Sequence, residues 1–89
     1  MINLIKNFGK IKNEVKLLFY LFVKTRREAL DKQGWVVLDY EEAMKVLNIT
    51  RSTLFRYIKA LLIFEYIEQF KEKKTVFRIK PEIFEEINI

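Results

Sequence analysis

Cysteine and histidine are both absent from this chain of 89 residues. Without cysteine the chain can form no disulfide, and no sign of an oxidising compartment is left. The two absences together remove the ligands of nearly all structural zinc sites, and they also remove the imidazole general base. The remaining carboxylates, lysines and hydroxyls form no recognisable catalytic cluster. We therefore expect a protein that is not an enzyme and that uses neither a metal nor a cofactor.

Long hydrophobic runs are also missing. The longest nearly uncharged apolar run spans residues 17–23, far short of the ~20 residues that cross a bilayer. Residues 1–9 are too short and too interrupted for the apolar core of a signal peptide, and no small-residue cleavage site follows them. We expect a soluble, cytoplasmic protein with no membrane partner.

Glycine and proline are scarce, with two glycines and one proline in the whole chain. So few breaks predict closely joined elements, and the length has room for one domain only. By contrast, hydrophobic residues make up 51% of the chain and include eight Phe, four Tyr and one Trp. Either the core is dense with aromatic rings, or part of the apolar surface meets another chain.

The charge is positive and unevenly distributed. The chain carries a net charge of +5, and residues 51–80 hold eight basic side chains against three acidic ones. The tail, residues 81–89, holds three acidic side chains and no basic one. A basic central third is typical of a protein that binds a polyanion, although a solvated basic face would look similar.

Helical periodicity predicts a first helix over residues 13–32. Val15, Leu18 and Phe22 belong to a broad apolar stripe at helical spacing. The stripe is wide enough to pack on its own domain and leave a strip for a partner. The aromatic run from Phe19 to Phe22 is expected mainly in the core, with one or two of its residues in a dimer interface. Gly34 is a stop signal, and residues 35–38 then predict a strand too short to stand without a partner.

Two further helices are predicted on either side of a tight turn. Asp39 and Glu42 have the spacing of a capping box, in which Asp39 accepts from a backbone amide and Glu42 reaches back. Asn48 suits a turn that needs a positive φ, and Thr50 is a good N-cap. The two predicted helices span residues 40–47 and 51–64.

Alternating residues predict a strand pair over residues 66–80, around a charged tip that contains Lys73 and Lys74. Pro81 suits the start of a short C-terminal helix, predicted over residues 82–88. Added to an edge of the hairpin, the strand at 35–38 would give a three-stranded antiparallel sheet. The expected fold is therefore one α+β domain over residues 1–89, with three helices, a small antiparallel sheet and a short C-terminal helix.

The segment from Glu41 to Leu61 resembles the helix-turn-helix of winged helix-turn-helix DNA-binding proteins. Its centre, Leu47-Asn48-Ile49-Thr50-Arg51-Ser52-Thr53-Leu54, is similar to a Leu-Gly-Ile-Ser-Arg-Ser-Thr-Val stretch. MarR-like and ArsR-like regulators, and small winged-helix proteins of archaeal viruses and plasmids, tend to show that stretch. The resemblance covers about residues 13–80, and it implies that helix 51–64 is the recognition helix and hairpin 66–80 is the wing.

Three residues depart from that family pattern. Asn48 replaces the usual turn glycine. Glu65 stands where many relatives carry a glycine between recognition helix and wing, so the helix is expected to end differently. Met44 stands where a small residue is usual, which points to wider spacing between the two helices before the wing.

The third helix carries most candidate DNA-binding residues. A B-DNA major groove is about 12 Å wide and accepts one α-helix, and a helix N-terminus with short hydroxyls favours phosphate. Arg51 and Arg56 lie about 140° apart around a helix, so one would read a base while the other holds a phosphate. Lys73 and Lys74 would lie over the minor groove or flanking phosphates. The predicted contacts are Thr50, Arg51, Ser52, Thr53, Phe55, Arg56, Lys59, Lys73 and Lys74.

Each of these residues also has a purely structural interpretation. The hydroxyls at the helix start would only cap it, and Arg56 and Lys59 would form surface ion pairs with Glu68 or a similar residue. The lysines at the hairpin tip would only protect a strand edge. Phe55 would meet either a thymine methyl or another protein.

The leading hypothesis is a sequence-specific double-stranded DNA-binding protein, a transcriptional regulator that acts as a homodimer on a palindromic operator. The candidate dimer surfaces are the first helix, the segment before it, and the apolar side of the C-terminal helix (Ile83, Phe84 and Ile87). One alternative is a plasmid or viral replication or DNA-architecture factor with the same fold. The other is a winged-helix protein-interaction module without DNA binding.

Overall fold

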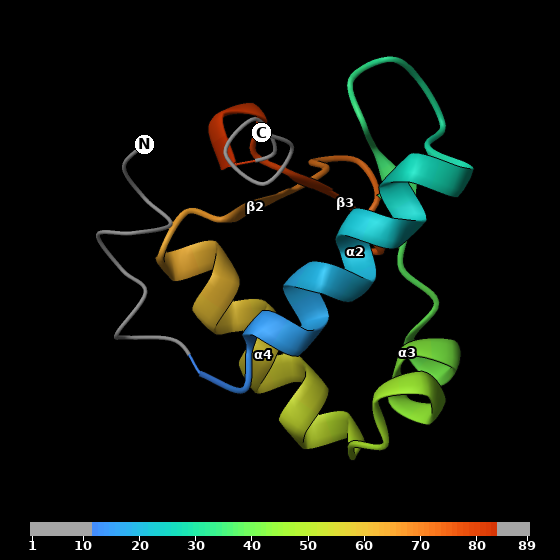
Figure 1. Ribbon diagram of the computed structural model, residues 1–89. Helices are drawn as coiled ribbons and strands as arrows, with labels where there is room; N and C mark the ends of the chain where they lie inside the picture. Colours follow the sequence, from blue (N-terminus) through green and yellow to red (C-terminus); the bar gives the residue numbers. More distant parts are fainter. Residues whose placement is uncertain (1–11, 84–89) are drawn as a thin grey trace.

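A computed structural model describes residues 12–83 of the chain. Its elements in chain order are α2 (Val15–Glu28), β1 (Val36–Val37), α3 (Tyr40–Leu47), α4 (Arg51–Ile63), β2 (Ile67–Gln69) and β3 (Val76–Ile79) (Figure 1). The described part is therefore an α+β structure with one small antiparallel sheet, and its elements follow the predicted order.

Helix α2 is shorter than predicted, because it ends at Glu28 rather than at residue 32. Its buried residues, Leu17, Leu18 and Leu21, all lie in the first half, whereas Leu30 is exposed and gives the helix no reason to continue. Ala29 leaves the helical conformation with ψ 137°. The amide of Leu30 then donates to the carbonyl of Trp35 at 2.7 Å, which closes the loop before β1.

The sheet has the strand order β1-β3-β2, so the short first strand adds to the hairpin as predicted. β1 pairs with β3 through Val36 opposite Phe77, and β2 pairs with β3 through Glu68 opposite Arg78. Each strand is shorter than the segment from which it was predicted. Helix α2 packs against β1 and β3, while α4 packs against β2.

Helices α3 and α4 are joined by a three-residue turn, residues 48–50. Asn48 has the predicted left-handed conformation, with φ 57°, and the amide of Ile49 donates to the carbonyl of Met44 at 3.0 Å. Thr50 caps α4, since its side chain accepts from the amide of Thr53. These local bonds fix where α4 begins.

The predicted capping box at the start of α3 is only half correct. The carboxylate of Asp39 does accept from the amide of Glu42, at 3.1 Å. The carboxylate of Glu42, however, accepts from Tyr20 and Lys24 of α2 instead of reaching back to the cap. The side chains of Tyr20 and Lys24 on the packed helix α2 thus take the place of the backbone amide that Glu42 was predicted to bind.

Helix α4 ends at Ile63, one residue before the predicted end. Glu65 then takes a left-handed conformation with φ 62°. The amide of Glu65 donates to the carbonyl of Leu62, and the amide of Tyr66 donates to that of Leu61. This is the bonding pattern of a Schellman cap, which usually places glycine at the left-handed position. The chain makes the turn with glutamate in that position.

The core lies between the helices and the sheet, and its largest fully buried side chains are Tyr66 and Phe77. A helical stretch begins at Pro81, one residue before the predicted start, and brings Ile83 into the core with no exposed surface. The amide of Lys80 donates to the carbonyl of Tyr66, which continues the pairing of β2 with β3 by one residue before the chain reaches Pro81. The prediction that Ile83 belongs to a dimer surface is therefore wrong. Phe84, Ile87 and the segment before residue 12 lie outside the described residues.

Candidate nucleic-acid interface

One face of α4 is polar, basic and open to solvent. Leu54, Ile58 and Leu61 are buried, and Tyr57 joins them on the buried side. The helix carries three basic residues and no acidic one. The exposed residues on the opposite face include those predicted from the sequence, Arg51, Ser52, Phe55, Arg56 and Lys59, and also Ile63, which is 63% exposed.

Two of the hydroxyls at the start of α4, those of Thr50 and Thr53, are hydrogen-bonded within the chain. Thr50 Oγ1 accepts from the Thr53 amide at 3.2 Å and lies 3.0 Å from Thr53 Oγ1. Arg56 Nη2 donates to Thr53 Oγ1 at 3.2 Å. Thr50 and Thr53 therefore have a structural role, and Arg56 has a hydrogen bond but, among residues 12–83, no ion pair.

Arg51 is the most constrained of the predicted contacts. Its Nη2 forms a hydrogen-bonded ion pair with Oε2 of Glu41 on α3. Its guanidinium carbon lies 6.0 Å from the centre of the Phe55 ring, and that ring meets the Tyr40 ring edge-on at 5.3 Å. Phe55 nevertheless remains 44% exposed, so its ring is supported by α3 and still accessible.

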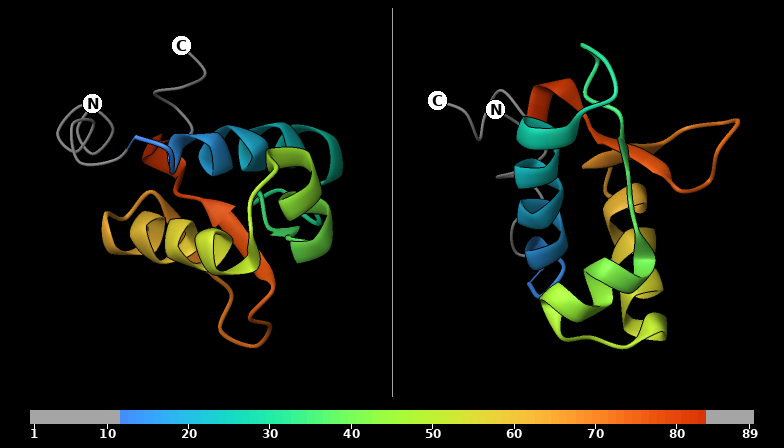
Figure 2. Two further views of the ribbon diagram at one scale, coloured as in Figure 1. Left: turned by 90° about the horizontal axis from the view of Figure 1, so that it is seen from below. Right: turned by 90° about the vertical axis from the view of Figure 1, so that its right-hand side faces the viewer.

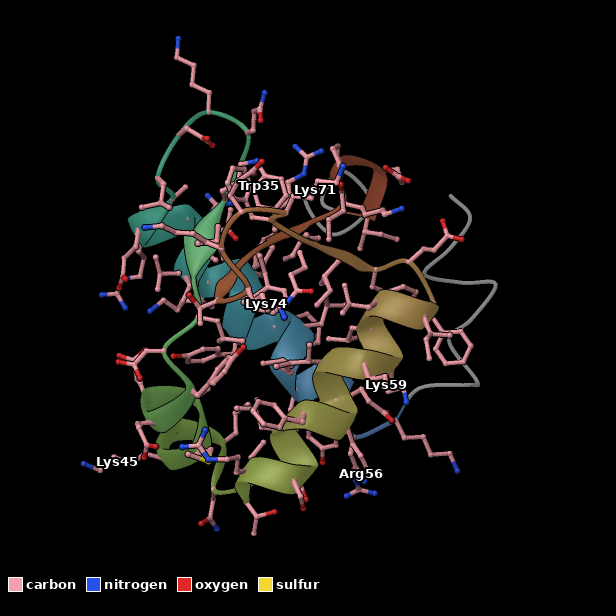
Figure 3. All side chains as sticks on the ribbon, turned by 180° about the vertical axis from the view of Figure 1, so that it is seen from behind. Trp35, Lys45, Arg56, Lys59, Lys71 and Lys74 are labelled. Carbon is pink, nitrogen blue, oxygen red and sulfur yellow. The ribbon has the colours of Figure 1, made fainter. Side chains whose placement is uncertain are left out.

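The hairpin tip carries further basic side chains. Lys71, Lys73 and Lys74 are all exposed, and Gln69 Nε2 fixes the turn by donating to the Lys74 carbonyl at 2.7 Å. The hairpin projects beyond α4 on the side of the molecule away from α2 (Figure 2). Viewed from that side, Arg56 and Lys59 of α4 and Lys71 and Lys74 of the hairpin are seen together (Figure 3).

We call these exposed basic residues of α4 and the hairpin the α4–hairpin face: Arg51, Arg56, Lys59, Lys71, Lys73 and Lys74. Within the described part of the chain, its four lysines form no salt bridge. Glu68 pairs with Arg78 at 3.0 Å rather than with Arg56 or Lys59. The alternative prediction, that Arg56 and Lys59 form surface ion pairs with Glu68, is therefore wrong. Lys71, which the list of predicted contacts omits, belongs to the same surface.

An aromatic cluster at the base of the hairpin was also missed. Arg78 lies over the Trp35 ring at 4.9 Å from its centre, and Trp35 meets Phe70 edge-on at 5.1 Å. Arg78 is held further by Glu68 and by the Gln33 carbonyl. The strand register explains the contact between Arg78 and Trp35. Val36 lies opposite Phe77 in antiparallel strands, so Trp35, which precedes Val36, lies beside Arg78, which follows Phe77.

A second exposed surface lies between α2 and α3. We call it the α2–α3 groove; it has a volume of about 480 Å³ and exposes Phe19, Val23 and Val46 at its apolar part. Two exposed apolar residues of α2, Phe19 and Val23, show that its wide stripe leaves an apolar strip that residues 12–83 do not cover, as expected. In Figure 2, α2 lies on the side of α4 opposite to the projecting hairpin.

Three of the charged side chains in the α2–α3 groove, Lys24, Glu28 and Glu42, pair with one another. Lys24 Nζ lies 3.2 Å from Glu28 and 3.1 Å from Glu42. Hydrogen bonds from Tyr20 and then Lys24 lower the pKa of the Glu42 carboxyl. Burial and the bond to that carboxylate raise the pKa of Tyr20. This network ties α3 to α2.

Neither a membrane-spanning helix nor a metal-ligand cluster is found in residues 12–83. No helix there has the length and apolar character to cross a bilayer, and no three acidic side chains come together as metal ligands.

The chain matches no protein-family model, no curated protein sequence and no solved structure.

Proposed function

We propose that this chain is a winged-helix protein that binds duplex DNA, with α4 in the major groove and the β2–β3 hairpin as the wing. The order of helices and strands and the sheet order β1-β3-β2 are compatible with that fold. The observation that carries the proposal is the α4–hairpin face, whose lysines are exposed and form no salt bridge within residues 12–83. Uncompensated cations on one face attract a polyanion.

Size and shape are consistent with this role. A helix of 13 residues is about 20 Å long at 1.5 Å per residue, and a major groove accepts one such helix. The hairpin projects on the same side as the exposed face of α4 (Figures 2 and 3). Lys73 and Lys74 would then reach phosphates beside the groove that holds Arg56 and Lys59.

The α2–α3 groove supports a second part of the proposal, a homodimer. Exposed apolar side chains that lie together are typical of a surface that another protein covers, and Phe19, Val23 and Val46 meet that description. Among the described residues, the groove is lined by α2 and α3 and by no residue of α4 or the hairpin, so a partner there would leave the α4–hairpin face open. We also propose that the protein acts in the cytoplasm, because a DNA-binding regulator acts in the compartment that holds its DNA.

The test is the salt dependence of binding to a labelled random-sequence duplex, measured by fluorescence anisotropy. The double variant Lys59→Ala with Lys74→Ala should lower the slope of log affinity against log salt by about two units, because each phosphate contact contributes about one. The matched control, Lys16→Ala with Arg27→Ala, removes two charges from the α2–α3 groove and should leave the slope unchanged. Equal effects of the two variants, or no binding by the unmodified chain, would refute the proposal.

A further inference from the structure

The side chain of Arg51 is held in place by residues of α3. Glu41 binds one terminal nitrogen of its guanidinium, and the Phe55 ring, itself supported by Tyr40, lies beneath the guanidinium carbon. Arg51 is still 51% exposed, and Glu41 is 76% exposed. The pair therefore stands at the start of α4 with both of its charged groups accessible.

Stability alone gives a poor account of this arrangement. Ion pairs between solvent-exposed side chains contribute little to folding, typically below about 1 kcal/mol. Glu41 also puts a negative charge beside α4, a helix with three basic residues and no acidic one, where it would repel DNA phosphates. Its carboxylate has a clear effect on geometry, however, since it restricts the rotamers of a long side chain.

The donors and acceptors of the pair match one base pair better than the others. A guanidinium has five N–H donors in a planar fork, so several remain after one terminal nitrogen binds Glu41. That fork fits the O6 and N7 acceptors of guanine in the major groove. A carboxylate accepts from the N4 amino group of cytosine. Arg51 and Glu41 together present both features side by side.

We propose that Glu41 positions Arg51 so that the pair reads a G·C base pair at the N-terminal end of α4. This inference rests on the proposed DNA binding and adds a specificity-determining residue to it. The carboxylate lowers affinity for DNA of any sequence and raises discrimination at one base pair. Loss of Glu41 therefore raises affinity for DNA of any sequence and lowers discrimination at that base pair. Loss of a merely structural ion pair would not change these two quantities in opposite directions.

The experiment begins with selection of bound duplexes from a random pool by the unmodified chain. The inference expects an enriched G·C pair, whose replacement by A·T lowers affinity about five- to a hundredfold. Replacing the guanine by 7-deazaguanine, which lacks the N7 acceptor, should give a comparable loss. The variant Glu41→Gln should bind random duplex more tightly and lose most of the preference for G·C. Arg51→Lys should lose the preference as well, because lysine has no planar fork.

The matched control is Glu65→Gln, which removes an exposed, ion-paired carboxylate outside both the α4–hairpin face and the α2–α3 groove and should leave the preference unchanged. Circular dichroism of each variant establishes that it is folded. If the chain selects no G·C pair, or if Glu41→Gln keeps full discrimination, the inference is overturned while DNA binding stands. If the unmodified chain binds no duplex, both this inference and the proposed function fail.

Discussion

The α4–hairpin face and the α2–α3 groove leave opposite kinds of group exposed. On the α4–hairpin face, lysines project into solvent without a salt bridge among the described residues. In the groove, Lys24 has two carboxylate partners, whereas Phe19, Val23 and Val46 remain exposed. The α4–hairpin face therefore exposes more cations without a salt bridge, whereas the groove pairs Lys24 and exposes a cluster of apolar side chains. The comparison favours a polyanion for the first surface and an apolar protein partner for the second.

The largest expected effect comes from reversing charge on the α4–hairpin face. Changing Lys59, Lys73 and Lys74 together to glutamate should lower affinity for random duplex on the order of a thousandfold near 0.1 M salt, since each phosphate contact contributes about tenfold there. The opposite change at the tip, Glu72→Lys, should raise affinity. Anisotropy titrations measure both variants. A triple variant that binds like the unmodified chain would remove the distinction between the two surfaces.

The next effect concerns self-association through the groove. Phe19→Glu with Val46→Lys should weaken the dimer at least about tenfold, because both side chains lose apolar contact and become charged at an interface. Sedimentation velocity over a concentration series measures this. Both residues are exposed, so the free energy of unfolding of the monomer should change by no more than about 0.5 kcal/mol. An unmodified chain that stays monomeric at tens of micromolar contradicts the dimer.

A smaller effect is expected on the stability of the fold. It distinguishes the ion-paired charges of the α2–α3 groove from the lysines of the α4–hairpin face. Hydrogen bonds in the folded state lower the pKa of Glu42, so its carboxylate stabilises the fold above the unfolded-state pKa, and this contribution is lost as pH falls through the folded-state pKa. Glu42→Gln should therefore lower the urea midpoint at pH 7, and the difference should disappear in acid. Lys59→Ala should shift the midpoint little at either pH. A Glu42→Gln deficit that persists unchanged at pH 3 would contradict this account.

The smallest effect lies where α4 meets the hairpin. Glu65 has φ 62°, a conformation that glycine adopts without steric cost, and its ion pair with Lys80 is long at 3.4 Å. Glu65→Gly should therefore stabilise the fold by roughly 0.5–1 kcal/mol and leave DNA affinity within about twofold, given one charge removed outside the face. Thermal unfolding and anisotropy together test this. Destabilisation by Glu65→Gly would show that the Lys80 pair outweighs the backbone strain.

Local signals predicted α3 and the turn before α4 well, because the cap at Asp39, the left-handed Asn48 and the cap at Thr50 each act within a few residues. The C-terminal end of α2 was predicted too late, since a bond between Leu30 and Trp35 fixes the loop that follows it.

The partners of charged side chains were the least predictable feature. Glu42 binds a helix 18 to 22 residues earlier in the chain, and Arg51 binds Glu41 only because α3 and α4 pack at the observed angle. The exposed face of α4 followed from helical spacing alone. Only the structure shows which cations on that face form no salt bridge with the described residues.

The central claim is that duplex DNA meets the α4–hairpin face and not the α2–α3 groove. Backbone amide chemical shifts, recorded while a random-sequence duplex is added to the full chain, test it most directly. We predict that the shifts change at Arg51–Lys59 and at Lys71–Lys74, and that those of Lys16–Arg27 stay constant. Changes that gather on α2, or no changes at all at saturating duplex, would contradict the account.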